Sequence, residues 1–384
     1  MIQLLGGLNI KIKTVYMIPS QSKKAKKKHS KGRHKKKPKG IYPVLKLLGI
    51  SLSSSPALQN EVTLSALNNP FVEAQETLSR HGLDISEKRV RTISEGVGAK
   101  ALEHREQQLE QFDDGTLTQE DTFKGKRVVI TIDGGRVRIR KTKKGRKKKK
   151  HKRKGYHTDW KEPKLFKIYA IDENGNKLDI EIPPHSDGTL HGREKFKHIL
   201  KMYIYKTSVV NADQIIFIAD GATWIWNVAD EIITEMNIDT SKVYNVLDFY
   251  HACEHLWAVI DAMSELDTAQ KHRLFKKYRS RLKNGHINSL IEMLGQKEPK
   301  NKDVHKELRY FHGIEDRCRY DLFVQQYIPI GSGAIESIIR RVVNLRLKGA
   351  GMFWVNQNVE AFLHLRCQLK ANRWNQFFIN HINL

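Results

Sequence analysis

The sequence predicts an α/β fold with a mixed sheet, in which an antiparallel meander of strands is followed by parallel strands. Two runs of apolar, largely β-branched residues, at 126–133 and 214–219, each end in an Asp followed by Gly. Such runs are typical of buried strands. After the first run come strand-like segments joined by turns, and helix-like and strand-like patterns then alternate. We therefore expect one central sheet that carries acidic side chains at an edge.

The elements of this sheet follow from hydropathy pattern and turn residues. The meander is predicted from strands at 126–133, 165–171 and 177–182, with the first either ending at Asp133 or continuing through 136–140. The alternating part comprises a helix at 190–205, a strand at 214–219, a helix at 223–236, a strand at 243–247 and a helix from Tyr250. This is the order of the ribonuclease H-like fold, whose first and fourth strands lie side by side. We therefore expect Asp133 and Asp220 to meet.

Composition divides the chain into four parts. We expect a basic, disordered tail over 1–40, a helical DNA-binding domain over 41–115, a ribonuclease H-like catalytic core over 120–264 and 326–384, and an all-α insertion over 265–325. Within the second part, two helical patterns flank a Gly-containing turn, which is the outline of a helix-turn-helix over 71–97. Its second helix would present Lys88, Arg89 and Arg91 to DNA. An ordinary two-helix corner in a small bundle explains this pattern equally well.

The excess of basic residues lies mainly in two short segments. The chain has a formal net charge of +26. Segments 23–39 and 141–154 each contain eleven Lys or Arg and no acid. Such runs bind polyanions, and because neither flanks an amphipathic or membrane-spanning segment, we expect DNA and no membrane as the partner. The three cysteines show no paired spacing, which fits a cytoplasmic, nucleoid-associated protein.

Three carboxylates form the candidate catalytic centre. Asp133 and Asp220 follow the two buried strands, and Glu336 lies in the first turn of a helical pattern that begins after Gly331-Ser332-Gly333. Taken singly, each acid is an ordinary residue of a turn or a helix start. Together, on these elements of one fold, they can bind two divalent metal ions, Mg²⁺ or Mn²⁺. Such ions activate a water or a 3′-hydroxyl for attack on a phosphodiester.

Other side chains near these acids are candidates for handling DNA. His251, three residues after Asp248, is a candidate for orienting the scissile phosphate or a water, whereas the spacing of this segment matches no zinc site. Three tryptophans are candidates either for core packing or for stacking on an unpaired base: Trp224, Trp226 and Trp354. Basic residues on the same segments are candidate DNA contacts: Arg136, Arg340, Arg341 and Lys348. The chain has no Gly-Lys-Ser/Thr phosphate-binding loop, which argues against ATP-driven chemistry.

The segments that carry these residues resemble DDE transposases of bacterial insertion sequences, most closely the ISKra-type group, which is related to mutator-like transposases. The matching pieces are Ile132-Asp133-Gly-Gly-Arg136, Trp160-Lys-Glu-Pro-Lys164, Ala219-Asp220-Gly-Ala-Thr-Trp224-Ile-Trp226, Leu247-Asp248-Phe-Tyr-His251-Ala-Cys-Glu-His255, Gly331-Ser-Gly-Ala-Ile-Glu336, Arg346-Leu-Lys-Gly-Ala-Gly-Met-Phe-Trp354 and Leu363-His-Leu-Arg366. The resemblance runs from about Tyr42 to Phe378. The basic segment 141–154 and the tail 1–40 depart from the family's pattern.

The resemblance implies a role for each acid and for the whole protein. Asp133 would be the first, Asp220 the second and Glu336 the last acid of the DDE set. Asp248-x-x-His251 matches the Asp/Cys-x-x-His signature of mutator-like transposases. The implied enzyme acts as a homo-oligomer on the terminal inverted repeats of its element and on target DNA. Two other hypotheses are an inactive or domesticated DNA-binding protein derived from such an enzyme, and a ribonuclease H-like nuclease without strand transfer.

Overall fold

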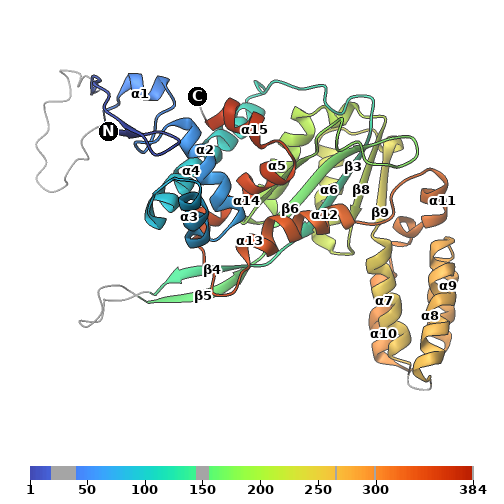
Figure 1. Cartoon of the computed structure of the whole chain (residues 1–384). Coiled ribbons are helices and arrows are strands. Elements are labelled where there is room, and N and C mark those ends of the chain that lie inside the picture. Colours follow the sequence, from blue (N-terminus) through green and yellow to red (C-terminus); the bar gives the residue numbers. More distant parts are fainter. Residues whose placement is uncertain (19–39, 144–154, 264–265, 298–299, 383–384) are drawn as a thin grey trace, which may run out of the picture. The chain divides into compact units, whose positions relative to one another are not determined.

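The computed structural model describes residues 1–18, 40–143, 155–263, 266–297 and 300–382 of the chain. The chain divides into two compact units, one formed by 1–104 together with 374–384 and the other by 105–373. Figure 1 shows that the first unit is mostly helical and that the second contains the main sheet. Helix α4 (Glu87–Asp113) belongs in part to each unit, so the division falls within a helix and not at the boundary expected near 115.

The main sheet of the second unit has five strands in the order β7-β6-β3-β8-β9. These strands are β3 (Arg127–Gly134), β6 (Lys164–Ile171), β7 (His185–Thr189), β8 (Gln214–Ala219) and β9 (Val243–Leu247). Strand β3 runs antiparallel to β6 and parallel to β8, which confirms the predicted mixed sheet. Thr131 of β3 pairs with Ile218 of β8. Asp133 lies two residues after Thr131, and Asp220 lies two residues after Ile218. The register therefore brings both acids to the same edge of the sheet.

The third strand of the meander lies later in the chain than predicted. We expected it at 177–182, where apolar residues alternate, but the strand that pairs with β6 is β7. In the predicted segment Lys177 makes an isolated bridge to Ile171, and the side chain of Ile180 is 92% exposed. The prediction was wrong because it selected strands by hydropathy. The true strand, β7, has the polar sequence His-Ser-Asp-Gly-Thr and is nevertheless buried. Buried partners on other elements satisfy the carboxylate of Asp187 in this strand, and hydropathy alone does not reveal them.

Residues 136–140 do not continue the first strand. Strand β3 ends at Gly134, and β4 (Val137–Thr142) pairs with β5 (Tyr156–Lys161) as a separate antiparallel ribbon. The chain changes course at Gly135, whose N–H donates to the carbonyl of Pro163 at 2.8 Å. Figure 1 shows β4 and β5 side by side, running away from the main sheet. The predicted basic loop lies, from residue 144 to 154, outside the described residues.

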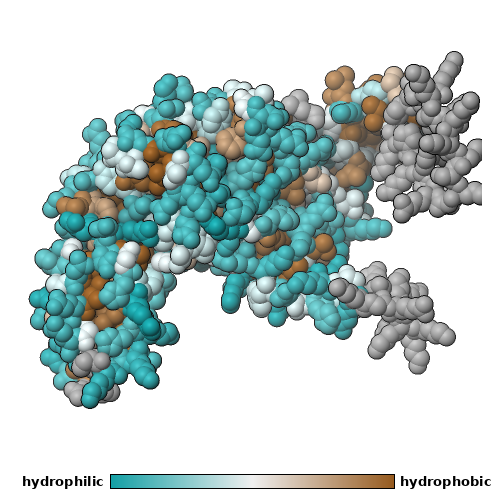
Figure 2. All heavy atoms as spheres, turned by 180° about the vertical axis from the view of Figure 1, so that it is seen from behind, coloured by the Kyte–Doolittle hydropathy of each residue, from teal (hydrophilic) through white to brown (hydrophobic). Residues whose placement is uncertain are grey.

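Helices that pack on the sheet begin and end within two residues of their predicted bounds. They are α5 (Gly192–Lys206), α6 (Thr223–Glu235) and α7 (Phe249–Asp261). Helix α5 packs on β6 and β7, and α6 packs on α5. Helix α12 (Gly333–Ile338), which continues as a π-helical turn and α13 (Leu345–Leu347), contacts β3 and β6, whereas α14 (Asn356–Lys370) contacts β7. Seen from behind, the surface is mostly hydrophilic, with hydrophobic residues in small separate patches (Figure 2).

The described part of the stretch 265–325 is helical and packs on α7. It contains α8 (Thr268–Lys283), α9 (Ile287–Lys297), α10 (Lys302–Leu308) and α11 (Tyr320–Gln325). Helix α8 begins with a capping box, in which the side chains of Asp267 and Gln270 each accept the other residue's backbone N–H. Helices α8 and α10 both contact α7, so these helices share one core with the sheet's own helix.

The first unit is built on a small helical core. Helices α2 (Pro56–Asn68), α3 (Phe71–Arg80) and α4 bury Leu58, Val62, Leu78, Val90 and Ile93. Helix α4 has 27 residues, so the second helix of the expected helix-turn-helix extends far beyond its predicted end near 95. Short helices α1 (Pro43–Leu47) and α15 (Trp374–Phe377) complete the unit.

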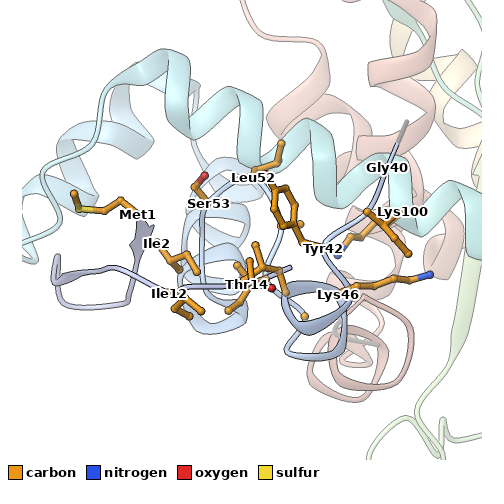
Figure 3. A pocket seen from close by; sticks show the side chains of 15 residues that line it. Met1, Ile2, Ile12, Thr14, Gly40, Tyr42, Lys46, Leu52, Ser53 and Lys100 are labelled. Atoms are coloured by element: carbon orange, nitrogen blue, oxygen red, sulfur yellow. The ribbon is translucent and has the colours of Figure 1, made fainter. Parts of the chain in front are cut away.

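Part of the segment expected to be a disordered tail forms structure in this unit. β1 (Ile2–Gln3) pairs with β2 (Asn9–Ile10), and the Ile2 side chain is buried. The basic run of this segment falls almost entirely within 19–39, outside the described residues. Next to the paired strands lies a cavity of about 710 Å³ (Figure 3). Its wall is largely apolar, with the amino groups of Lys46 and Lys100 at its edge, and none of the three predicted catalytic acids lines it.

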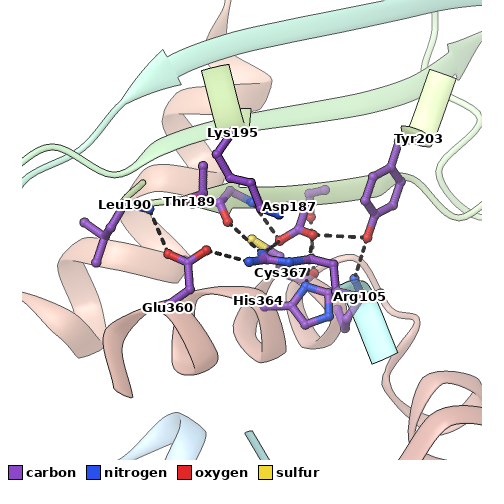
Figure 4. Close-up of polar contacts among 12 residues, drawn as sticks. Arg105, Asp187, Thr189, Leu190, Lys195, Tyr203, Glu360, His364 and Cys367 are labelled. Atoms are coloured by element: carbon purple, nitrogen blue, oxygen red, sulfur yellow. Dashed lines mark hydrogen bonds and ion pairs between the residues drawn. The ribbon is translucent and has the colours of Figure 1, made fainter. Parts of the chain in front are cut away.

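A network of buried charges connects the edge strand β7 to two helices (Figure 4). Arg105 of α4 pairs with Asp187 of β7 at 3.4 Å and with Glu360 of α14 at 2.5 Å, and all three side chains are almost completely buried. His364 Nδ1 and the Tyr203 hydroxyl lie 3.0 and 3.3 Å from Asp187 Oδ2. Burial opposes ionisation of Asp187, but His364 and Arg105 outweigh it and lower its pKa. These polar partners explain how a polar strand can be buried.

His185, the first residue of β7, should make the stability of the protein depend on pH. Its ring is buried against Phe123 and Tyr203, and its Nε2 has no hydrogen-bond partner among the described residues. Burial, with smaller contributions from Arg373 and Lys206, lowers its pKa well below 6.5. Below the pKa of the unfolded imidazole, the unfolded chain therefore binds a proton that the folded chain does not.

The stabilising effect of a neutral His185 is thus complete above about pH 6.5 and is lost as the pH falls. We expect its contribution to the free energy of unfolding to fall by up to about 1.4 kcal/mol per pH unit. Denaturant unfolding of the wild type and of His185→Leu, between about pH 7 and about pH 5, measures the effect. The variant should show the smaller slope, and equal slopes would contradict this assignment.

Candidate active site

Asp133 lies at the end of β3, where the chain leaves the sheet. Its Oδ1 accepts a hydrogen bond from the Gly134 N–H at 2.6 Å, and its Oδ2 has no donor among the described residues. Burial raises the pKa of Asp133 to about 6, the Gly134 N–H opposes this rise, and the negative charges of Asp220, Glu336 and Glu162 add to it. Asp220 and Glu336, the other two acids predicted from the sequence, are therefore close enough to Asp133 for their charges to act on it.

Asp220 follows β8 directly and is fixed by the start of α6. Its Oδ1 accepts the N–H of Ala222 at 2.9 Å, and its carbonyl accepts the indole N–H of Trp226 at 2.8 Å. The ring of Tyr310 packs so closely on Gly221 that a Cβ at this position would overlap it. Glycine is therefore required beside the second acid, while Oδ2 of Asp220 keeps no donor among the described residues.

Glu336 lies in the first turn of α12 and is exposed to solvent. Negative charge is favourable at this end of a helix. Helix α12 contacts β3, the strand that ends in Asp133, which explains why the two carboxylates interact. The hydroxyl of Ser332, one turn earlier, lies 3.5 Å from Glu336 Oε1. The position of Glu336 therefore depends on the turn that contains Ser332.

Asp248 holds that turn in place. It is 2% exposed, and its Oδ1 caps α7 by accepting the N–H groups of Tyr250 at 2.6 Å and His251 at 3.2 Å. Its Oδ2 accepts both the N–H of Ser332, at 2.9 Å, and the Ser332 hydroxyl. With four donors, Asp248 joins the start of α7 to the turn before Glu336. It is a positioning residue, a role that its sequence pattern alone did not reveal.

His251 lies in the first turn of α7, beside aromatic side chains. Its Nδ1 is 3.2 Å from Glu254 Oε2, and its ring meets the rings of His255 and Tyr310 edge-on, at 5.1 and 5.9 Å between centroids. Burial and then the charge of Asp220 raise the pKa of Tyr310. Tyr310, from the stretch 265–325, therefore lies between His251 and the second acid. No sequence pattern pointed to it.

Glu162 and Lys164 form a second group that sequence reasoning missed. Glu162 follows β5 and adds to the negative charge around Asp133, and Lys164 at the start of β6 pairs with it at 3.2 Å. The Lys164 Nζ also lies 3.7 Å from the ring centroid of Trp224, whose edge contacts Phe196. The one signal in the sequence was that both residues belong to the Trp160–Lys164 segment of the family resemblance.

The two alternatives left open for the tryptophans are decided for Trp226 and Trp354. Trp226 is 2% exposed, and the Arg317 guanidinium lies 4.2 Å from its ring centroid. Trp354 is 7% exposed, and its indole N–H donates to the carbonyl of Leu347 at 3.1 Å. Both rings are buried and their N–H groups are already bonded, which favours core packing over base stacking for these two residues. Trp224 is partly buried, and the Lys164 amino group makes a cation–π contact with its ring.

The basic residues predicted to contact DNA differ in their surroundings. Four of them in the second unit are exposed: Arg136, Arg340, Arg341 and Lys348. In the first unit, Arg89 donates to Ser54 Oγ at 2.8 Å, and Arg91 pairs with Glu87 at 2.7 Å. Lys88 is exposed, and its amino group makes no hydrogen bond or ion pair with a described residue. Arg89 therefore braces its own unit, which favours the two-helix corner over base contact for this residue.

The gathered carboxylates have the donor chemistry of a site for hard divalent cations. Asp133 and Asp220 each keep one oxygen without a donor among the described residues, and the pKa of Asp133 is raised by burial and, to a smaller extent, by neighbouring negative charge that a cation would neutralise. Within the described ranges, no three His, Cys, Asp or Glu side chains are arranged so as to hold an ion as they stand. The carboxylate oxygens of Asp133, Asp220 and Glu336 are of the chemical type that such a cation prefers, and these three residues are the ones that would hold it.

Comparison of the chain with protein-family models, with curated proteins and with solved structures found no match. The resemblance to DDE transposases therefore stays a prediction from its motifs. Among the helices of the described ranges, none is long and apolar enough to cross a membrane.

Proposed function

We propose that this protein is a DDE-type transposase that cleaves DNA at the ends of an insertion sequence and joins the 3′ ends to target DNA. One observation carries the proposal: Asp133, Asp220 and Glu336, 203 residues apart from first to last, come near one sheet edge, where burial and then the charges of Asp220 and Glu336 raise the pKa of Asp133 to about 6. Uncompensated charge of this kind is unfavourable for folding, and strongly perturbed carboxylates are concentrated at functional sites.

The strand order supports this proposal. An antiparallel meander β3-β6-β7 with two further strands parallel to β3 is the arrangement expected of a ribonuclease H-like core. In such a core the first and fourth strands present two acids to the same substrate. Here these strands are β3 and β8; Asp133 is the next-to-last residue of β3, and Asp220 directly follows β8.

Each residue of the site has a definite task in this mechanism. Two bound Mg²⁺ or Mn²⁺ ions would supply activation of the attacking water or 3′-hydroxyl and stabilise the leaving oxygen. Asp133 and Asp220, each anchored by a backbone N–H, offer their second oxygen as ligand. Asp248 fixes Ser332 and thereby the start of α12, so that Glu336 closes the donor set. His251, in the first turn of α7, would orient the phosphate.

The partner in this proposal is duplex DNA, namely the terminal inverted repeats of the element and its target. The two basic runs, each with eleven Lys or Arg, would neutralise backbone phosphates and release counterions, which strengthens binding without regard to sequence. We further propose that the enzyme acts as a homo-oligomer on DNA, because both element ends must be held together for joining, and that it is associated with the nucleoid.

The metal requirement tests the proposal. Cutting of a duplex that carries an element end, taken from inverted repeats that flank the gene, should require Mg²⁺ or Mn²⁺. Ca²⁺ should support binding but little cutting, because its coordination is looser in geometry. Single-turnover cutting and joining assays in each ion measure this, and full activity in a chelator would contradict it. Cutting without joining would identify a nuclease, and binding without cutting in any ion would identify an inactive derivative.

A further inference from the structure

The β4–β5 ribbon carries a row of arginine and aromatic side chains on one face. The register pairs Arg138 with Trp160 and Thr142 with Tyr156, so these residues share a face of the ribbon. Val137 and Ile139, at the start of β4, point to the other face and are buried. The ribbon is therefore anchored at the start of β4, whereas the end of β4 and nearly all of β5 are exposed to solvent.

The solvent face is held in a defined shape by cation–π contacts. The Arg138 guanidinium lies 5.1 Å from the ring centroid of Trp160 and 5.6 Å from that of Phe353, and Arg140 lies 5.5 Å from that of Tyr156. Backbone bonds between the ribbon and Trp354, at 2.7 and 3.0 Å, fix Phe353 beside it. We call these residues the arginine–aromatic strip: Arg138, Arg140, Tyr156, Trp160 and Phe353.

The strip remains open to solvent despite its apolar rings. Trp160 is 46% exposed and Tyr156 is 44% exposed, in contrast to the buried Trp226 and Trp354. Each ring carries a guanidinium near one face, and its exposed remainder can receive a base while the guanidinium N–H groups can bind phosphates. Proteins that bind single-stranded nucleic acid combine these same two elements. In a duplex, by contrast, the base faces are covered by their neighbours.

The ribbon that carries the strip is joined along the chain to the segments of two carboxylates, Asp133 and Glu162. Strand β4 begins three residues after Gly134, the last residue of β3, and β5 ends one residue before Glu162, whose charge raises the pKa of Asp133. Both ends of the ribbon are thus joined directly to the segments that carry the acids. Of all the surfaces in the described ranges, this one combines exposed rings, ordered arginines and attachment to the candidate active site.

We propose that the arginine–aromatic strip binds unpaired DNA nucleotides next to the scissile position, with bases stacked on Trp160 and Tyr156 and phosphates held by Arg138 and Arg140. This assignment deepens the proposed function and rests on it for the relation to cleavage. The binding itself is measured separately. The proposal requires that these side chains let the protein bind an unpaired strand differently from a duplex.

The test compares two fluorescently labelled probes, an oligothymidylate and a blunt duplex of the same length, by anisotropy at fixed salt in a chelator. The full-length Asp133→Asn protein serves as background, so that no probe is cut. Trp160→Ala should weaken binding of the single strand about tenfold, the loss of one stacked base, and should change duplex binding less than about twofold. Trp160→Leu should lose as much, since it keeps an apolar side chain but no π face, whereas Trp160→Phe should retain most of the affinity.

Tyr327→Ala is the matched control, because Tyr327 is 57% exposed and lies outside the strip. It should bind both probes like the background protein. Equal losses on the two probes in Trp160→Ala would show that the rings only brace phosphate contacts, and would overturn the assignment, as would unchanged binding of the single strand. A background protein that binds neither probe would overturn both this assignment and the proposed function. Selective loss on the single strand supports the strip whether or not cleavage is ever observed.

Discussion

Replacing Asp133, Asp220 or Glu336 by the corresponding amide should lower the rate of DNA cleavage by roughly a thousandfold or more. A neutral ligand cannot balance the charge of ions that contribute several kcal/mol to transition-state stabilisation, and about 1.4 kcal/mol corresponds to a factor of ten in rate. The amide keeps the shape of the side chain, and Asn at 133 can still accept the Gly134 N–H. Single-turnover cutting, measured together with binding of the same duplex, should show loss of the rate and little change in affinity.

Stability separates this effect from simple unfolding. Burial and three neighbouring carboxylates raise the pKa of Asp133, so its charge is unfavourable in the metal-free protein at neutral pH. Asp133→Asn should therefore unfold at the same temperature as the wild type or at a higher one. Glu173→Gln, at an exposed acid in the turn after β6, is the control and should cut at the wild-type rate. Substantial cutting by any of the three amide variants would remove that residue from the metal site.

The parts of the fold that the sequence predicted well are those where hydropathy and burial agree. The strands that end in Asp133 and Asp220 were found because β-branched residues fill them and both faces of the sheet are covered. Strand β7 was missed because its burial depends on Arg105, Glu360 and His364, which are far away in the chain. Ile180 gave the opposite error, since an apolar side chain in an alternating pattern can still be fully exposed.

In the candidate site, too, the sequence predicted the residues that follow a local pattern and missed those that depend on tertiary contacts. Sequence reasoning found the acids because each follows a recognisable element. It could not find Tyr310, which reaches Gly221 through the packing of the helical stretch, or the link from Asp248 to Ser332, which joins residues 84 positions apart. Trp226 and Trp354 show the converse, because a tryptophan near an acid in sequence carries no information about whether its ring is covered. Such contacts depend on the tertiary structure and leave no local pattern.

Replacing Arg105 by Met should destabilise the second unit by about 3–5 kcal/mol, the effect of removing one partner from a buried ion pair. Arg105 is 2% exposed, and its loss would leave Glu360 and Asp187 buried without their cation. Burial opposes the charge of Arg105, but the two carboxylates outweigh it and raise its pKa, so the guanidinium is ionised at any accessible pH. Urea unfolding of the variant and the wild type measures the difference, with Lys124→Ala at an exposed pair as a control expected to change stability by less than about 0.5 kcal/mol.

A double-mutant cycle with Glu360→Gln shows whether the loss comes from the unpaired charge or from lost packing. If the charge dominates, Arg105→Met/Glu360→Gln should be less destabilised than the sum of the single variants, because the amide removes the charge that Arg105 neutralised and can still accept the N–H of Leu190. Additive losses would instead mean that Arg105 acts through its packed methylene groups. A strong coupling would explain why a strand as polar as β7 can lie at the edge of the main sheet: Asp187 is held there by Arg105 and His364, and the main chain of Leu190 by Glu360. The edge of the sheet farthest from β9 would then be held by charge pairing between α4, β7 and α14, and not by apolar packing alone.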